Sequence, residues 1–222
     1  MDKKIGVGLI GAGFIGSIHA DSFKKINDAD ILAVMSPPPG EAQKFAEKHQ
    51  IPKHFTELDQ LLALEEIDMV IIGAPNHVHC EITLKAAEAG KHVVVEKPFT
   101  LKTSDADQLI ALAEKQGLVL SVYHNRRWDG VYLTVKEVLA SGKLGRLVDF
   151  EVHFDRYRNY IKESWKDQAN GTGTLYNLGS HLIDQAISLF GMPNRLFCDT
   201  RMLRDGALTD DSYDLWLHYP EF

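Results

Sequence analysis

The sequence predicts an α/β protein in which a doubly wound parallel sheet is followed by an α+β domain with an open, mostly antiparallel sheet. In the first half of the chain, short apolar runs alternate with helical patterns, which is typical of β-α units that build a parallel sheet. Within Leu147–Asp155, apolar and polar residues alternate, as in an antiparallel strand covered on one face. We therefore expect a first domain at 1–123 and a second domain, whose sheet is incomplete, at 124–222.

Composition and charge exclude several classes of protein. The 222 residues are 45% apolar, which is ordinary for a packed globular protein, and the net charge of -7 gives no basic footprint for a nucleic acid. No apolar run approaches the roughly 20 residues that a membrane helix needs, and Met1 to Lys4 lead directly into a strand. We expect a cytoplasmic protein that binds neither nucleic acid nor membrane. The two cysteines, Cys80 and Cys198, form no disulfide framework and are too few for a thiolate zinc site.

A glycine-rich turn follows the first predicted strand, Ile5–Ile10. It has the pattern G-x-G-x-x-G and opens a helical pattern, and its residues are Gly11, Ala12, Gly13, Phe14, Ile15 and Gly16. Glycines at these positions allow a tight turn and a close approach of a pyrophosphate, whose charge then meets the free amides of the helix N-terminus. The turn therefore predicts a Rossmann-type dinucleotide site.

The second predicted strand, Ile31–Met35, is followed by Ser36. At this place an acidic residue would hold the ribose hydroxyls of NAD, whereas here a serine is followed by three prolines. A site without a carboxylate would not repel the 2′-phosphate of NADP, although no arginine is at hand to pair with it. We expect NAD or NADP, with a slight preference for NADP.

The β-α alternation continues along the chain. We expect helices at Glu41–His49, 57–64 and 78–90 and a strand at 68–72. Between the last strand and the last helix lies the loop Gly73–Cys80, GAPNHVHC, which includes Ala74, Asn76 and His79. Its H-x-H-C spacing could hold a metal, but a second thiolate or a carboxylate pair is missing, so we predict no metal and expect the loop to cover the cofactor.

The β-branched run that begins at His92 reads as a buried strand, and it ends in Glu96, Lys97 and Pro98. Ligands bind at the carboxyl ends of strands in an open parallel sheet. An isolated E-K-P sequence is also compatible with a strand, a turn and a solvated lysine. The glycine-rich turn before it and the histidine-bearing helix after it favour an active-site lysine.

The first domain ends in a helix, a strand and a polar loop. We expect the helix to have Ser104 as its N-cap and to run to Gln116, and a strand to follow at Leu118–Val122. The next loop, 123–130, reads YHNRRWDG and contains Arg127. It is either a linker with two snorkelling arginines or a segment that contacts a ligand, and its place at a strand end favours ligand contact. A helix at 131–140 comes next.

In the second domain, strands are predicted at Leu147–Asp155, Leu196–Leu203 and Tyr213–Tyr219. Between the first two, Thr174–Phe190 has the pattern of one amphipathic helix closed by Gly191. Its polar face carries Asn177, His181, Asp184 and Ser188. This face is either a solvated stripe or the place of a proton acceptor for alcohol oxidation.

Five ordered motifs together resemble the Gfo/Idh/MocA oxidoreductases over the whole chain. They are the G-x-G-x-x-G turn, A-P-N-H-V-H, E-K-P, N-R-R and G-T-L-Y-N-L-G-S-H-L-I-D. The sequences H-N-R-R-W-D and H-F-D-R-Y-R most resemble the scyllo-inositol dehydrogenase-like branch. The resemblance implies a nucleotide-binding domain, a second α/β domain, and assembly into homodimers or homotetramers. Family members are longer, so we expect the chain to be a fragment cut at its C-terminal end.

The resemblance also implies roles for single residues. Lys97 matches the family's active-site lysine and His181 its catalytic histidine, and the implied cofactor contacts include Asn76, His79, Glu96 and Trp165. Asn177 stands where many members have an aspartate. This departure matters because a carboxylate would favour the imidazolium form of His181, whereas an amide can only orient hydroxyls or the ring.

These residues suggest reversible hydride transfer between a nicotinamide and a secondary alcohol of a cyclic polyol or sugar. His181 would take the hydroxyl proton, Lys97 would bind the same oxygen, and Asn177, Asp155 and Arg127 would hold other hydroxyls. The alternative is a protein of the same fold that senses a dinucleotide or sugar without turnover. The presence of both Lys97 and His181 favours the enzyme, and Asn177 weakly favours the sensor.

Overall fold

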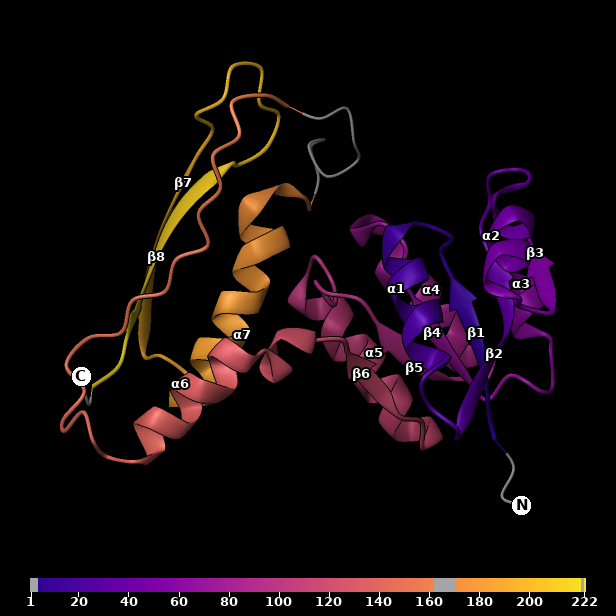
Figure 1. Ribbon diagram of the computed structural model, residues 1–222, viewed down its shortest axis with the longest axis horizontal. Helices are drawn as coiled ribbons and strands as arrows, with labels where there is room; N and C mark the ends of the chain where they lie inside the picture. Colours follow the sequence, from indigo (N-terminus) through magenta and orange to yellow (C-terminus); the bar gives the residue numbers. More distant parts are fainter. Residues whose placement is uncertain (1–3, 162–170, 221) are drawn as a thin grey trace. The chain divides into compact units, whose positions relative to one another are not determined.

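The computed structural model describes residues 4–161, 171–220 and 222. The chain divides into two compact units, Met1–Tyr123 and His124–Phe222. Figure 1 shows the elements of each unit. Within the described residues, no helix is both long enough and apolar enough to cross a membrane.

The first unit is built on one parallel sheet. Its order is β3-β2-β1-β4-β5-β6, the doubly wound order expected from the alternating pattern. The strands are β1 Ile5–Ile10, β2 Ala29–Met35, β3 Lys53–Phe55, β4 Met69–Ile72, β5 His92–Val95 and β6 Leu120–Val122. The short edge strand β3 was not predicted, because its three residues, Lys-His-Phe, carry no apolar run of their own.

Helices connect these strands. They are α1 Phe14–Phe23, α2 Glu41–His49, α3 Leu58–Leu62, the 3₁₀ turn η1 Asn76–Val78, α4 His79–Glu88 and α5 Thr103–Gln116. The prediction that Ser104 caps α5 is wrong, since Lys102 holds the N-cap position and the Ser104 hydroxyl bonds to Asp105. The glycine stop is confirmed at Gly117, which takes the left-handed conformation with φ 66°.

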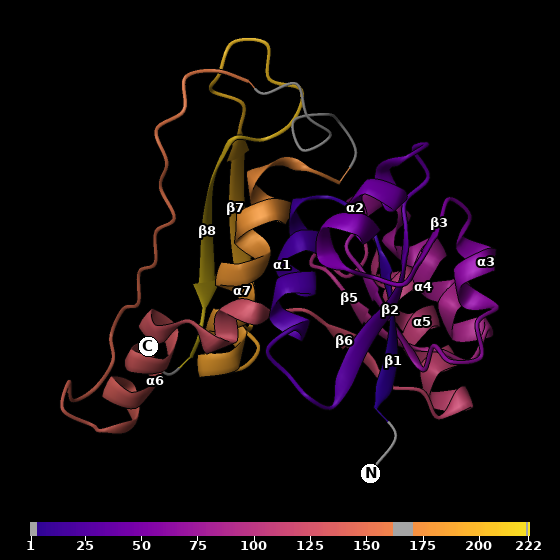
Figure 2. The same ribbon diagram turned by 45° about the vertical axis from the view of Figure 1, so that its right-hand side comes forward.

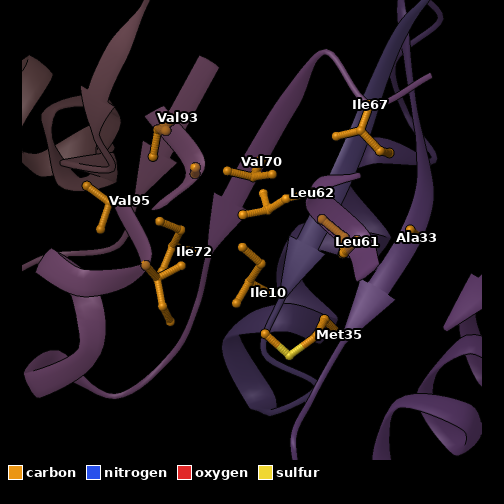
Figure 3. Packing of buried hydrophobic residues seen from close by; sticks show 12 residues of the cluster. Ile10, Ala33, Met35, Leu61, Leu62, Ile67, Val70, Ile72, Val93 and Val95 are labelled. Carbon is orange, nitrogen blue, oxygen red and sulfur yellow. The ribbon is translucent and has the colours of Figure 1, made fainter. Parts of the chain in front are cut away.

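Two buried clusters cover the two faces of the sheet. The cluster under α1 and α2 includes Val7, Leu9 and Phe45, and the cluster under α3 and α4 includes Ile10, Leu61 and Ile82. Figure 2 shows α1 and α2 on one side of the sheet and α3, α4 and α5 on the other. In Figure 3, Ile10, Ile72 and Val95 follow one another across β1, β4 and β5. Both faces are therefore buried, as near-continuous apolar strands require.

All six strands are parallel, so their carboxyl ends meet at one edge of the sheet. The chain order reverses between β1 and β4, which are neighbours in the sheet. At such a switch point the loops diverge and leave a crevice in which ligands of this fold class bind. The segments that follow β1, β2, β4 and β5 at this edge carry the predicted cofactor residues other than Trp165.

The second unit combines helices with a two-stranded antiparallel sheet. Its elements are η2 Asn125–Trp128, α6 Gly130–Ala140, a π-helical turn η4 Leu175–Gly179, α7 Ser180–Phe190, β7 Arg195–Arg201 and β8 Ser212–His218. Arg195 pairs with His218 and Arg201 with Ser212. An aromatic cluster forms around Phe190, whose ring contacts those of Phe150, Tyr219 and Phe222.

The prediction of a strand at Leu147–Asp155 is wrong. These residues run without assigned secondary structure, and Val148 and Val152 expose 64% and 45% of their surface. The segment is instead held by side chains: Phe150 packs on Phe190, and the Arg126 guanidinium lies 4.9 Å from the Phe154 ring centre. An alternating pattern indicates one covered face, but a strand also needs a neighbour for its backbone hydrogen bonds.

Candidate active site

The glycine-rich turn links β1 to α1. Gly11 has φ 109°, and a Cβ placed on it would lie 2.5 Å from the carbonyl oxygen of Gly73; a Cβ on Gly16 would collide with the carbonyl oxygen of Gly11. A Cβ on Gly13, in contrast, would meet nothing within 4 Å. Thus the first and third glycines are required by the packing of the protein, whereas the second leaves open space above the backbone.

This turn fits the pyrophosphate of a dinucleotide. Gly13 is the N-cap of α1 and has no side chain to bond the first amides of the helix. Those amides and the positive end of the helix dipole therefore face the open space beside Gly13. Phe14 at the start of the helix is 78% exposed and Ile15 is half-buried, and the cofactor contacts predicted for both remain predictions.

Ser36 directly follows β2 and lies beside the glycine turn, because the Gly11 N–H donates to the carbonyl of Met35 at 2.8 Å. The Ser36 hydroxyl donates to Oε2 of Glu41 at 2.9 Å. As the sequence indicates, no carboxylate follows β2 directly, but the structure brings the carboxylate of Glu41 to Ser36. The acid comes from the first residue of α2, five positions further along the chain, where the expected spacing did not point to it.

The loop after β4 is braced by His79, which is completely buried. One ring nitrogen lies 2.8 Å from the carbonyl oxygen of Pro98, and the other lies 2.9 Å from that of Ala74. Burial lowers the pKa of His79, although the two carbonyl groups act in the opposite direction. His79 therefore ties the loop after β4 to the loop after β5, and its predicted contact with a cofactor remains a prediction, as does that of the buried Asn76.

The alternative of a metal at His77, His79 and Cys80 has no support in this geometry. His77 is exposed, while both ring nitrogens of His79 face backbone carbonyls. Across the described residues, no group of three or more His, Cys, Asp or Glu side chains is arranged to hold a metal ion.

Glu96 and Lys97 follow β5 at the same edge. Glu96 is buried, and its Oε1 lies 3.0 Å from Nε2 of His19 on α1, whose ring packs against Tyr123 at 4.7 Å between centres. Burial, with a smaller contribution from the charge of Glu96, raises the pKa of Tyr123. Lys97 is half-buried and is joined to Pro98 by a cis peptide bond. His19 was not singled out from the sequence, because one histidine inside a helix carries no pattern.

In the second unit, the predicted helix Thr174–Phe190 begins differently from the expectation. Its first turn, Leu175–Gly179, is π-helical, and the α-helix starts at Ser180. Asn177 therefore lies in the wider turn and is half-buried, while His181 lies in the first turn of α7 and is 7% exposed. Short π-helical turns are frequent at functional sites.

The loop before β8 holds the start of this helix. The Leu175 N–H donates to Oδ2 of Asp210 at 2.7 Å, and the Thr174 N–H donates to the carbonyl of Asp210 at 2.9 Å. Gly173 has φ 91°, and a Cβ there would collide with Oδ1 of Asp210. Only glycine fits this approach, so Gly173 and Asp210 together position the turn that carries Asn177.

Residues of η2 and α6 form hydrogen bonds with the polar face of the helix. Arg127 donates from Nε and Nη2 to the two carboxylate oxygens of Asp184, at 2.8 and 2.6 Å, and this bonding raises the pKa of Arg127. The Tyr132 hydroxyl donates to Ser188 at 2.8 Å. The face is thus no solvated stripe, and Arg127, predicted to bind substrate, has one edge of its guanidinium committed to Asp184.

Two other predicted residues lie elsewhere. Asp155 is exposed, and its carboxylate lies 3.7 Å from Nδ1 of His153, which is also exposed. Trp165 lies outside the described residues. The roles predicted for both remain predictions.

Family models cover nearly the whole chain. The model described as "Oxidoreductase family, NAD-binding Rossmann fold" of the Gfo/Idh/MocA group matches residues 5–124, and the "GFO/IDH/MocA C-terminal domain" matches residues 132–221. The chain belongs to the Gfo/Idh/MocA oxidoreductase family. The resemblance drawn from the five motifs is confirmed, and so is the α/β fold class.

Several Gfo/Idh/MocA proteins are similar in sequence. The oxidoreductase YdgJ of Escherichia coli is 40% identical over 100% of this chain and 64% of its own length. IolW of Bacillus subtilis, named scyllo-inositol 2-dehydrogenase (NADP(+)), is 36% identical over 97% of this chain and 60% of its own length. An oxidoreductase of Schizosaccharomyces pombe is 49% identical over 75% of this chain and 46% of its own.

Solved structures agree with this assignment. The oxidoreductase yvaA of Bacillus subtilis has a TM-score of 0.90 and 34% identity, over 99% of this chain and 62% of that one. YPO2259 of Yersinia pestis has a TM-score of 0.88 and 41% identity, over 100% and 62%. The chain thus spans less than two thirds of the length of each of these relatives.

Proposed function

We propose that the protein is an NAD(P)-dependent dehydrogenase that acts on a secondary alcohol of a cyclic polyol or sugar. The observation that carries the proposal is the turn Gly11–Gly16 at the switch point, where the packing requires the first and third glycines and leaves the second, Gly13, open toward the first amides of α1. The relative IolW, named as a scyllo-inositol dehydrogenase, and a Thermotoga maritima relative, named myo-inositol 2-dehydrogenase, support an inositol-like substrate.

Each of the predicted site residues would have its own role in the reaction. A bound nicotinamide would supply or accept the hydride. His181 would take the proton of the substrate hydroxyl, and Lys97 would donate a hydrogen bond to the same oxygen and stabilise its developing negative charge. Asn177, Asp155 and Arg127 would bind other hydroxyl groups. Arg127 can do so only with the part of its guanidinium that Asp184 does not use.

The surroundings of Ser36 affect the choice between NAD and NADP. The slight preference for NADP was expected because no carboxylate follows β2 directly, and the bond from Ser36 to Glu41 removes that reason. We retain NAD and NADP as the candidates. By analogy with the family, we also propose that the full-length protein assembles as a homodimer or homotetramer.

The test is an assay of cofactor reduction by the full-length protein against a panel of inositols and cyclic sugars, with NAD and with NADP. The proposal expects turnover with at least one polyol and saturation by one dinucleotide. Tight dinucleotide binding without turnover on any member of the panel would contradict the enzyme and favour the sensing alternative. Size-exclusion chromatography with light scattering checks the proposed assembly.

A further inference from the structure

We propose that Glu41, held by Ser36 at the carboxyl end of β2, makes the dinucleotide site selective for NAD over NADP. The inference rests on the proposed function, since it requires a dinucleotide in this site. It deepens that function by assigning the cofactor and the residue that selects it. It also reverses the slight preference for NADP expected from the sequence.

Ser36 and Glu41 lie where a ribose would be recognised. Met35 pairs with Ile10 across β2 and β1, so the residue after β2 is next to the glycine turn that would hold the pyrophosphate. In dinucleotide-binding sheets of this order, the group at this place bonds the hydroxyls of the adenosine ribose. Ser36 is 5% exposed, so little of its side chain can reach a ligand.

The chain between the two residues folds back on itself. Gly40 adopts the left-handed conformation with φ 77°, and the Glu41 N–H donates to the carbonyl of Pro38 at 3.2 Å. This compact turn through three prolines and a glycine brings the first residue of α2 back to the end of β2. The carboxylate that other sites of this kind take from the strand end is therefore supplied here by the helix.

In the hydrogen bond between Ser36 and Glu41, the serine is the donor and the carboxylate is the acceptor. A serine hydroxyl has one hydrogen, and Ser36 directs it to Oε2 of Glu41 at 2.9 Å. Ser36 therefore has no donor left for a phosphate oxygen. The exposed carboxylate of Glu41 is a hydrogen-bond acceptor, which suits the 2′-hydroxyl of NAD, a donor, and not the acceptor oxygens of a 2′-phosphate.

Charge adds to this mismatch. A 2′-phosphate near Glu41 would place two like charges within a few ångströms, and an arginine that could offset them is absent from the described residues of this loop and of α2. Of the nearby lysines, Lys53 on β3 is paired with Glu66, and Lys44 lies three residues along α2 from Glu41. Capture of the phosphate by Lys44 would produce the opposite preference, which the experiment below detects.

The experiment measures the dissociation constants of NADH and NADPH for the full-length protein by fluorescence titration, without substrate. We expect NADH to bind at least about tenfold more tightly, the effect of one charge-assisted hydrogen bond. Glu41→Gln, which removes the charge at an exposed position, should reduce this ratio at least about fivefold. Glu47→Gln is the matched control, because Glu47 lies on the same helix, is also exposed, and accepts its bond from Gln43 rather than Ser36.

A second variant tests the serine. Ser36→Ala keeps the charge of Glu41 but removes the bond that holds it, and the NADH preference should fall while remaining above that of Glu41→Gln. An equal or tighter binding of NADPH by the unmodified protein, or the same ratio in Glu41→Gln and Glu47→Gln, would overturn the inference alone. Absence of binding by both dinucleotides would overturn the proposed function and the inference with it.

Discussion

The residues before and after Lys97 are both held in place by contacts with helices. Glu96 before it is bonded to His19 on α1, and the carbonyl of Pro98 after it faces a ring nitrogen of His79 on α4. The strand end is thus fastened to one helix on each face of the sheet, while the Lys97 side chain itself stays half-buried. Such bracing from neighbouring elements is what a positioned catalytic amine requires.

The first prediction concerns this lysine. Lys97→Ala should lower kcat by about 100-fold or more, because a donor aimed at developing oxyanion charge is lost, while the NADH dissociation constant changes by less than about threefold. Steady-state kinetics and fluorescence titration measure the two. Lys102→Ala, an exposed lysine at the N-cap of α5, is the control. Retained turnover in Lys97→Ala would remove Lys97 from the proposed mechanism.

The second prediction concerns Asn177. A carboxylate near His181 would favour the imidazolium form. Alcohol oxidation needs the neutral imidazole and declines when the pH falls below the pKa seen in the rate profile. Asn177→Asp should therefore raise this pKa by about one unit. The pH dependence of kcat/KM measures this shift, and Asn177→Ser, which adds no charge, should not produce it. An unmoved profile in Asn177→Asp would show that the two side chains are not coupled.

At the scale of elements, the helix that carries His181 is held at its start by a residue that is distant in the sequence, Asp210. Its first turn is π-helical, and Asp210 bonds its leading amides in place of a capping side chain from the helix itself. Asp210 lies some 35 residues along the chain from Leu175, so no sequence motif for capping could reveal it.

The third prediction follows from this contact. Asp210→Ala should destabilise the protein by about 0.5–2 kcal/mol, the usual effect of removing a helix cap, because the Leu175 amide loses its charged acceptor. Urea unfolding of the purified protein measures the change. Asp205→Ala, an exposed aspartate in the same loop, should have little effect. Equal stability of the two variants would show that the cap is not significant.

For the molecule as a whole, two buried histidines link stability to pH. Burial lowers the pKa of both His49 and His79 from 6.5. For His49 the nearby Asp21 acts in the opposite direction without reversing the shift. A histidine with a lowered pKa binds its proton more readily in the unfolded chain, so folding is favoured above pH 6.5 and loses free energy as the pH falls below it.

The fourth prediction is that thermal stability decreases from pH 7.5 to pH 5.5. Differential scanning calorimetry at several pH values measures it. His49→Gln, which removes one of these titrations, should flatten the dependence, whereas His153→Gln should not, since His153 is 69% exposed. A pH dependence that is unchanged in His49→Gln would exclude His49 as a source.

Local patterns predicted the first sheet well, because each element there carries its own signal. The apolar run Ile5–Ile10, the glycine turn and the helix Glu41–His49 have the predicted bounds. The strand predicted at Leu147–Asp155 failed because a strand depends on a partner that its own residues do not specify. The roles assigned to Lys97, His181 and the other site residues remain predictions from motifs.

By itself, the sequence determined the parallel α/β architecture, the glycine turn and the family, since these depend on residue types at short spacings. Only the tertiary structure decided which residues that are far apart in the sequence contact each other. It joined Glu41 to Ser36, His19 to Glu96 and Asp210 to Leu175. These pairs depend on how turns and distant strands bring polar atoms to within 3 Å, and no periodicity along the chain records such contacts.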